Sequence, residues 1–280
     1  MQSDTQAWAA VGVALYATDP ERKIAQVRAL RWPLALMPEV AAPALSDMPG
    51  RPAHPLLVSP KNLPKRRALH TRAGRFALLH ALAHIEFNAI NLALDALYRF
   101  PGLPEDFYRD WLRVAQEETE HFVLLRQQLR RLGGDYGDLP AHDGLWEMAL
   151  DTAADPLARM ALVPRVLEAR GLDVTPAMRE RLLAAGDAEA AAVLERIECD
   201  ERGHVAVGTR WFRFLCAQRG LEPDRTFTTL LQRHYRGRIQ GPLALPARRA
   251  AGFSEPELDW LQDRAARPTA GQPAAGVHHD

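Results

Sequence analysis

The stretch AQEETEHFVLL, residues 115–125, mixes charged and apolar side chains on one face of a helix. Val114, Glu118, His121 and Leu125 follow one another at intervals of three or four residues, the spacing of a single α-helical face. Val and Leu in this pattern are typical of a face that is buried in a core. A carboxylate is rarely buried there without a partner. The stretch therefore predicts a long helix that carries Glu118 and His121 into the core for a chemical reason.

Four segments of the chain have the periodicity of long amphipathic helices. They are residues 68–98, residues 105–132, a segment that starts at Asp155-Pro156, and residues 187–219. Asp followed by Pro is typical of a helix start, because Asp accepts free backbone N–H groups and Pro fits the first turn. A longer connection, residues 135–154 with one short helix, joins the second segment to the third. We therefore predict an all-α fold, a four-helix bundle with a crossover connection.

The third segment contains two residues that disturb a helix. Pro164 is expected to kink it, because proline lacks a backbone N–H group. Gly171 is expected to end it, and residues 171–186 would then carry the chain around to the fourth helix. Glu168 lies only three residues before this glycine, so the second hairpin would not mirror the first.

Extensions flank the predicted bundle, which spans residues 67–220. Residues 1–66 are rich in proline and are expected to wrap around the bundle as an N-terminal extension. Residues 221–264 suggest a C-terminal extension with two further helices on either side of GPLALP. Residues 265–280 have the Pro, Gly and Ala content of a disordered tail.

Composition excludes several classes of function. Lys plus Arg and Asp plus Glu both number 35, so the formal net charge is zero. The chain as a whole therefore has no net charge that would attract nucleic acid or a membrane surface. The basic cluster at residues 59–75 could meet RNA phosphates, but such clusters are more often solvated. Two cysteines, Cys199 and Cys216, form no disulfide framework or nucleophilic triad, and no signal peptide or membrane span of ~20 apolar residues is evident. A cytoplasmic protein without a membrane or nucleic-acid partner is expected.

Polar residues recur in the apolar stripes of all four helices. They are Glu86, Glu118 with His121, Glu168, and Glu201 with His204. Residues i and i+3 share one helix face, so each Glu-x-x-His presents a carboxylate and an imidazole to one point. The order also repeats, because Glu86 precedes its Glu-x-x-His by 32 residues and Glu168 precedes the other by 33. In a helical hairpin that turns at residues 100–104, Glu86 and Glu118 would lie at the same height.

Buried acids in this number predict a metal site. Four carboxylates in a core would each cost several kcal/mol of desolvation unless neutralised, and two divalent cations cancel four negative charges. Mixed nitrogen and oxygen ligands suit iron, manganese or zinc, whereas Ca²⁺ and Mg²⁺ prefer oxygen alone. The alternative is a metal-free interaction scaffold in which acids and histidines pair with one another or are solvated.

The arrangement resembles the ferritin-like di-iron carboxylate proteins, in which two helices supply one Glu each and two supply Glu-x-x-His. More narrowly, five stretches within about residues 60–220 are similar to the DUF455 family of bacterial ferritin-like proteins. They are HTRAGRFALLHALAHIEFNAINLALDALYRF, EETEHF, YGDLPAHDGLWEMA, LVPRVLEARGLDVTP and DERGHVAVGTRWF.

The resemblance implies a ligand set and an activity. Glu86 and Glu168 would be the single carboxylates, and the two Glu-x-x-His pairs would supply the remaining ligands, with Glu118 and Glu201 as bridging groups. Two metal ions are implied, with iron favoured, manganese the alternative, and no organic cofactor. The implied activity is O₂- or peroxide-dependent oxidation of an unidentified small molecule by a monomer or dimer, with electrons from a separate reductase. Iron oxidation or storage and tRNA hydroxylation are the alternatives.

Other acids and histidines near the six candidate ligands have less specific interpretations. Glu117 and Glu120 are expected at the surface, with Glu117 as an alternative partner of His121 through their i,i+4 spacing. Glu198 is expected at the surface, with an additional ligand role as its alternative. His80 and His84 are expected to make structural hydrogen bonds.

Overall fold

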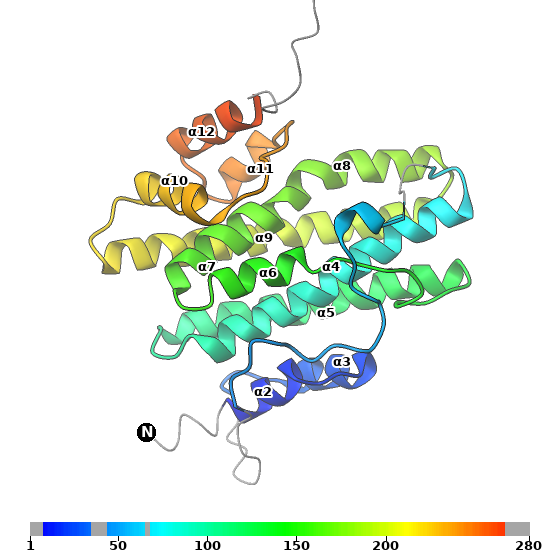
Figure 1. The fold of residues 1–280 in the computed structure, drawn as a ribbon, viewed down its shortest axis with the longest axis horizontal. Coiled ribbons are helices and arrows are strands. Elements are labelled where there is room, and N and C mark those ends of the chain that lie inside the picture. The colour runs from blue at the N-terminus through cyan, green and yellow to red at the C-terminus, as the bar shows by residue number, and fades with distance from the viewer. Residues whose placement is uncertain (1–7, 35–43, 65–67, 267–280) are drawn as a thin grey trace, which may run out of the picture.

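The computed structural model describes residues 8–34, 44–64 and 68–266, and these residues form an all-helical protein (Figure 1). Within them there is no strand, and a single parallel bridge joins Leu57 to Ala141. The all-α prediction is confirmed. Residues 65–67 of the basic cluster and residues 267–280 of the expected tail lie outside the described residues.

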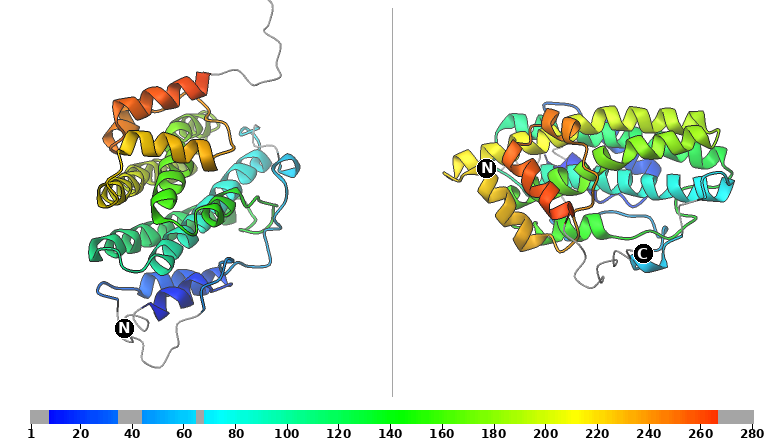
Figure 2. Two further views of the ribbon diagram at one scale, coloured as in Figure 1. Left: turned by 60° about the vertical axis from the view of Figure 1, so that its left-hand side comes forward. Right: turned by 90° about the horizontal axis from the view of Figure 1, so that it is seen from above.

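Two long helical hairpins form the body of the molecule. The first is α4 (Arg72–Arg99) with α5 (Glu105–Arg131), and the second is α8 (Ala169–Ala184) with α9 (Ala188–Gln218). Helix α5 contacts α9, so the hairpins lie side by side (Figures 1 and 2). The chain crosses between them through the short helix α6 (Gly144–Asp151). The buried stripes of α4, α5 and α9 therefore face a common interior.

Aspartate side chains cap two helices of the second half, and the cap at Asp155 is the one that the sequence predicts. The Asp155 side chain accepts a hydrogen bond from the Leu157 N–H group at the start of α7 (Pro156–Leu162). Asp187 accepts one from the Ala190 N–H group at the start of α9. Gly186 lies between α8 and α9 with φ +77°, a conformation that side chains other than glycine's rarely adopt. The turn between these helices is therefore tight.

The expectation that a helix ends at Gly171 is wrong. Helix α7 continues through a π-helical turn, η2 (Val163–Glu168), directly into α8, which includes Gly171. A glycine inside a helix costs only about 1 kcal/mol, and burial of Leu172 and Leu182 in α8 outweighs that cost. The second hairpin therefore mirrors the first, and Glu168 lies inside a continuous helical segment.

The distortion expected at Pro164 takes the form of the η2 turn. Proline lacks the N–H group that an α-helical bond would use, and a π-turn accommodates this loss. Helix α9 crosses here at close range, because a Cβ atom placed on Gly208 would lie 2.4 Å from Cβ of Pro164. A glycine at this position thus lets the η2 turn approach α9.

Both extensions are helical and are tied to the hairpins by buried charges. In the N-terminal part, α2 (Ala9–Leu15) and α3 (Pro20–Ala29) are followed by a 3-10 turn, η1 (Pro60–Asn62). The Lys23 ammonium group of α3 is fully buried. It donates hydrogen bonds to the carbonyl oxygens of Ala14 and Leu15 and to Asn91 Oδ1 of α4, at 2.7–2.9 Å. Lys23 therefore fastens α2 and α3 to α4.

The C-terminal extension has three helices among its described residues, rather than the two expected. They are α10 (Pro223–His234), α11 (Leu245–Ala250) and α12 (Glu255–Ala266). Helix α12 includes Ala265 and Ala266, which were expected to begin the tail. A buried ion pair between Arg165 of η2 and Glu257 of α12, 2.6 Å long, holds this extension against the second hairpin.

Helix α4 is long and apolar enough to cross a membrane by length and composition, although the sequence shows no uninterrupted apolar run. In the folded protein, 83% of its most apolar 18-residue window is buried. Its apolar character is thus explained by its place in the core, against α5 and α2.

His80 and His84 make the structural hydrogen bonds that the sequence suggests. His80 Nε2 accepts from the N–H groups of Gly137 and Leu139, at 3.0 and 3.3 Å. His84 Nδ1 lies 3.0 Å from the Tyr136 hydroxyl. Both histidines thus fasten the connection after α5 to helix α4.

The His80 contacts predict acid-sensitive stability. Burial lowers the pKa of His80 to about 4, against the opposing effect of nearby Asp138. The unfolded chain, with a histidine pKa near 6.5, therefore binds an extra proton, and the stability that His80 contributes above pH ~6.5 is lost as pH falls towards 4. From pH 7 to pH 5, the metal-free wild type should lose ~2 kcal/mol more than His80→Gln. Urea unfolding at both pH values measures this, and parallel losses would contradict it.

Candidate metal centre

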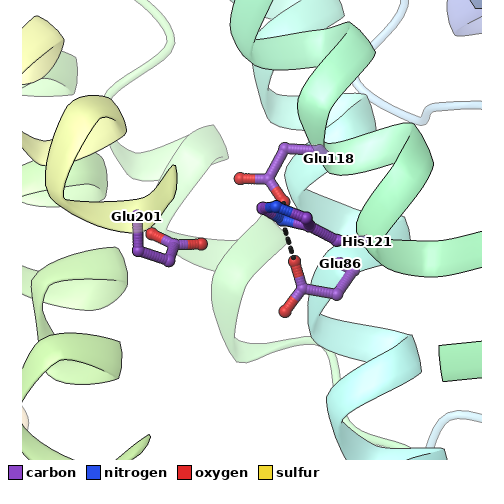
Figure 3. A group of neighbouring side chains, drawn as sticks. All are labelled: Glu86, Glu118, His121 and Glu201. Carbon is purple, nitrogen blue, oxygen red and sulfur yellow. Dashed lines mark hydrogen bonds and ion pairs between the residues drawn. The ribbon is translucent and has the colours of Figure 1, made fainter. Parts of the chain in front are cut away.

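Four of the six predicted ligands converge in the interior between the hairpins (Figure 3). Glu86 comes from α4, Glu118 and His121 from α5, and Glu201 from α9. One ligand atom from each lies within 4.8 Å of the others, and all four residues are buried. In Figure 3, Glu201 faces the other three from the opposite helix. Residues far apart in the sequence therefore offer their donor atoms to one small volume.

His204 joins this group through Glu118. Its Nδ1 atom lies 2.9 Å from Glu118 Oε1 and 3.8 Å from Glu201 Oε1, and the residue is fully buried. The His204 and His121 rings are 5.7 Å apart, measured between centroids. Glu118 thus lies between the two imidazoles, since its Oε2 atom is 3.2 Å from Nδ1 of His121.

Glu168 is placed less directly than the other five. It ends the η2 turn and lines the same cavity as Glu86 and Glu201. Its Oε2 atom is buried and has no hydrogen-bond partner among the described residues. Burial, together with the charges of Glu201 and Glu118, raises the pKa of Glu168 well above its usual value. The Glu168 carboxylate therefore lies close enough to Glu201 and Glu118 for their charges to affect it.

An acid of the opposite helix contacts the Nε2 atom of each histidine. His121 Nε2 lies 3.1 Å from Oδ2 of Asp200, and His204 Nε2 lies 2.8 Å from Oε2 of Glu117. An ionised carboxylate can only accept, so each Nε2–H donates, and Nδ1 is the nitrogen that can bind a metal once it has lost its proton. Such a carboxylate fixes the orientation of a metal-binding imidazole and raises its basicity.

These two acids are the part of the site that sequence reasoning missed. The i,i+4 spacing of Glu117 and His121 suggests that these two are partners, but the structure pairs Glu117 with His204. The helical stripes of the sequence do not point to Asp200. The available signal was that Glu117 and Asp200 each directly precede the glutamate of a Glu-x-x-His motif.

Two other acids near the motifs have surface partners. Glu198 forms an ion pair with Arg202 of 2.9 Å, on the side of α9 that faces α8. Glu120 is exposed and pairs with Arg28 of α3 at 2.7 Å. Both acids are thus engaged by arginines, but only Glu120 is at the surface as expected, because the Glu198 side chain is 12% exposed and packs towards α8.

The carboxylates of the cluster have divergent proton affinities. Burial and the charge of Glu118 raise the pKa of Glu86 well above its usual value, and the same two causes raise the pKa of Glu201. Burial also acts to raise the pKa of Glu118, but His204 and His121 beside it hold that pKa below its usual range. In the metal-free protein, Glu118 therefore has the lowest proton affinity of these three carboxylates, and Glu86 and Glu201 bind a proton more tightly than usual.

The histidines respond to the same carboxylates. Burial acts to lower the pKa of His121, yet its hydrogen bond with Glu118 and the nearby carboxylate of Glu86 raise it to about 11. Burial likewise opposes protonation of His204, whose pKa is nevertheless raised well above its usual value by Glu118 and Glu117. Protons therefore occupy the cluster where cations would otherwise balance its charge.

Unsatisfied buried atoms indicate that the cluster fits a cation. Among the described residues, five of its donor atoms lack a hydrogen-bond partner: Glu86 Oε2, Glu118 Oε1, Glu168 Oε2, Glu201 Oε2 and His204 Nδ1. Some approach an imidazole, as Glu86 Oε2 does at 3.3 Å from His121 Nδ1, but without hydrogen-bond direction. Each unsatisfied group costs ~1–3 kcal/mol. Carboxylate oxygen with imidazole nitrogen is a donor set that suits iron, manganese and zinc.

The acids behind the histidines should control metal affinity. We expect Glu117→Gln and Asp200→Asn each to weaken Fe(II) or Mn(II) binding by ~10–100-fold, because the imidazole that each supports loses its orientation and basicity. Titration against a competing chelator measures the affinity. Glu120→Gln is the matched control on α5 and should leave affinity unchanged. Affinities within twofold of wild type in both variants would contradict the assignment.

A cavity of about 280 Å³ adjoins the cluster. Glu86, Glu168 and Glu201 form part of its wall, and helices α4, α8 and α9 enclose it. Most of the remaining lining is apolar, including Leu78, Leu82, Leu92, Val174, Met178 and Leu194. The acids thus border a space that suits a small apolar molecule.

The relatives of the chain carry no assigned activity. A model described as "Protein of unknown function (DUF455)" matches residues 16–259. An "Uncharacterized protein" of Haemophilus influenzae (strain ATCC 51907 / DSM 11121 / KW20 / Rd) is 44% identical over 275 residues, covering 92% of this chain and 94% of that protein. No solved structure matches the chain. The chain therefore belongs to the DUF455 family.

Proposed function

We propose that the chain is a ferritin-like four-helix protein with a carboxylate-bridged dinuclear metal centre. Its ligands are Glu86, Glu118, His121, Glu168, Glu201 and His204. Four helical segments supply them in the ferritin-like pattern, one Glu each from two segments and Glu-x-x-His from the other two. The convergence of these buried donors, several of them unsatisfied, is the observation that carries the proposal.

We infer that the reaction is an O₂- or peroxide-dependent oxidation of a small organic molecule. Two iron ions held here would supply the activation of the oxidant, with electrons delivered by a separate reductase. Glu118 lies between the two histidines and is placed to bridge, while Glu117 and Asp200 hold the imidazole rings. The chain itself contributes a site in which five of the six proposed ligands are buried.

The cavity beside the centre favours an enzyme over an iron store. Its lining away from the acids is mostly apolar, which suits an organic substrate. Iron that moves to and from a store needs polar groups along its route. An organic substrate bound in this cavity would border Glu86, Glu168 and Glu201, and therefore the proposed metals.

The test is anaerobic loading with Fe(II) followed by mixing with O₂. We expect about two iron ions per chain and a transient visible absorption that develops within seconds and then decays. Elemental analysis and stopped-flow spectroscopy provide the two readouts. Protein that retains no iron after desalting, or that retains iron without any reaction with O₂, would refute the metal centre or the oxidative role, respectively.

A further inference from the structure

The cavity beside the metal centre adjoins a second cavity. We call the first, of about 280 Å³, the inner cavity, and the second, of about 620 Å³, the outer cavity. Ile85, Leu145, Leu167 and Arg170 line both. The outer cavity lies between the second hairpin and the C-terminal extension, which contributes Tyr235 and other residues to its wall. The outer cavity is therefore a route towards the acids of the centre.

The inner cavity is apolar except at a few positions. Its polar lining consists of the three acids of the centre, Thr175 and Arg170. Arg170 follows Glu168 by two residues, and helical residues at that spacing do not share a face. Arg170 also lines the outer cavity, whereas the acids of the centre do not. The cationic group thus marks the junction of the two cavities.

The charges of the outer cavity leave Arg170 available for an anion. Asp173 is the one acid among the described residues that line this cavity. Its carboxylate accepts two hydrogen bonds from Arg248, at 2.7 and 3.0 Å, and lies 3.5 Å from Arg170. Arg165 forms a separate ion pair with Glu257. The Arg170 side chain is 36% exposed and donates a hydrogen bond to the Gln240 carbonyl. It shares the Asp173 carboxylate with Arg248.

We propose that the substrate is an unbranched apolar chain that ends in a carboxylate. The chain occupies the inner cavity beside Glu86, Glu168 and Glu201, and the carboxylate binds Arg170 at the junction. The inference rests on the proposed function for the role of the metals, but this binding uses side chains that the metal-free protein already presents.

The volume of the inner cavity limits the length of the chain. At ~30 Å³ for a water-sized group, about 280 Å³ accommodates roughly nine carbon-sized groups. Each methylene buried there should raise affinity about fourfold, equivalent to ~0.8 kcal/mol. Affinity should therefore rise with chain length and stop rising near ten carbons.

The experiment is isothermal titration calorimetry on metal-free, full-length protein. The probes are hexanoate, octanoate and decanoate, with the n-alcohols and n-alkylamines of the same lengths. We expect carboxylates to bind ~10-fold or more tightly than the alcohols, because an arginine–carboxylate pair is a charge-assisted interaction, and amines to bind most weakly. Equal affinity for the three head groups, or no increase with chain length, would overturn the proposal.

Two sets of variants locate the head group and the chain. Arg170→Gln should abolish the preference for carboxylates over alcohols, and Arg170→Lys should keep part of it. Arg181→Gln, an exposed control on α8, should change nothing.

A Cβ atom on Gly171, which lines the inner cavity, meets no atom within 4 Å. Gly171→Leu should therefore weaken decanoate more than hexanoate, whereas Gly203→Leu on α9, which lines neither cavity, should weaken neither.

Each variant result decides one half of the proposal. An unchanged preference in correctly folded Arg170→Gln would place the head group elsewhere, and an unchanged chain-length profile in Gly171→Leu would place the chain elsewhere. Because no metal is present, a failure here is distinct from a failure of the iron and O₂ experiment.

Discussion

Replacing Glu118 with alanine is expected to reduce bound iron from about two ions per chain to fewer than one. Glu118 is fully buried and lies within 3.2 Å of Nδ1 of His121 and within 2.9 Å of Nδ1 of His204. It is the carboxylate placed to contact a metal bound at either histidine. Its removal would therefore take a ligand from both ions, whereas loss of a terminal ligand affects one.

Elemental analysis after anaerobic loading and desalting measures this effect. Glu201→Ala, at the other predicted bridging position, should also lose iron. Glu120→Ala is the matched control, because it removes a carboxylate two positions away on α5 that pairs with Arg28 at the surface. A folded Glu118→Ala protein that still holds two ions would show that this residue is not a bridging ligand. Circular dichroism establishes that the variant is folded.

Helical periodicity could place the polar residues but not all of their partners. A stripe at 3.6-residue spacing reports which face of a helix is buried, so Glu118 and His121 could be assigned to the interior from their neighbours alone. The contact of Asp200 with His121 depends on how α9 packs against α5. That packing is set by many side chains across the interface, and a single sequence does not encode it locally.

The break expected at Gly171 fails for a related physical reason. Local helix propensity differs by only about 1 kcal/mol between glycine and alanine, and burial of one leucine contributes more. Leu172 and Leu182 are buried along α8, so tertiary packing extends the helix through the glycine. The π-turn at Pro164 was foreseeable as a distortion, but its geometry depends on the close approach of Gly208 in α9.

Arg165→Met is expected to destabilise the metal-free protein by ~3–5 kcal/mol, because it leaves a carboxylate buried without its cation. Arg165 and Glu257 are both fully buried and are joined at 2.6 Å. The guanidinium group also lies over the rings of Phe212, Phe227 and Phe253, with Cζ-to-centroid distances of 4.5, 4.2 and 4.5 Å. Water cannot readily replace the lost charge in this aromatic enclosure.

A double variant separates the ion pair from simple loss of packing. When both partners of a buried pair become apolar, stability is often retained, so Arg165→Met with Glu257→Leu should recover most of the loss of Arg165→Met alone. Urea unfolding of the three proteins measures the coupling. If the double variant is as unstable as the single one, the contacts of Arg165 with the three phenylalanine rings, and not its charge, hold the C-terminal extension on the η2 turn. Recovery would mean that Glu257 needs this cation, and that the extension is attached to the Glu168-bearing turn chiefly through charge.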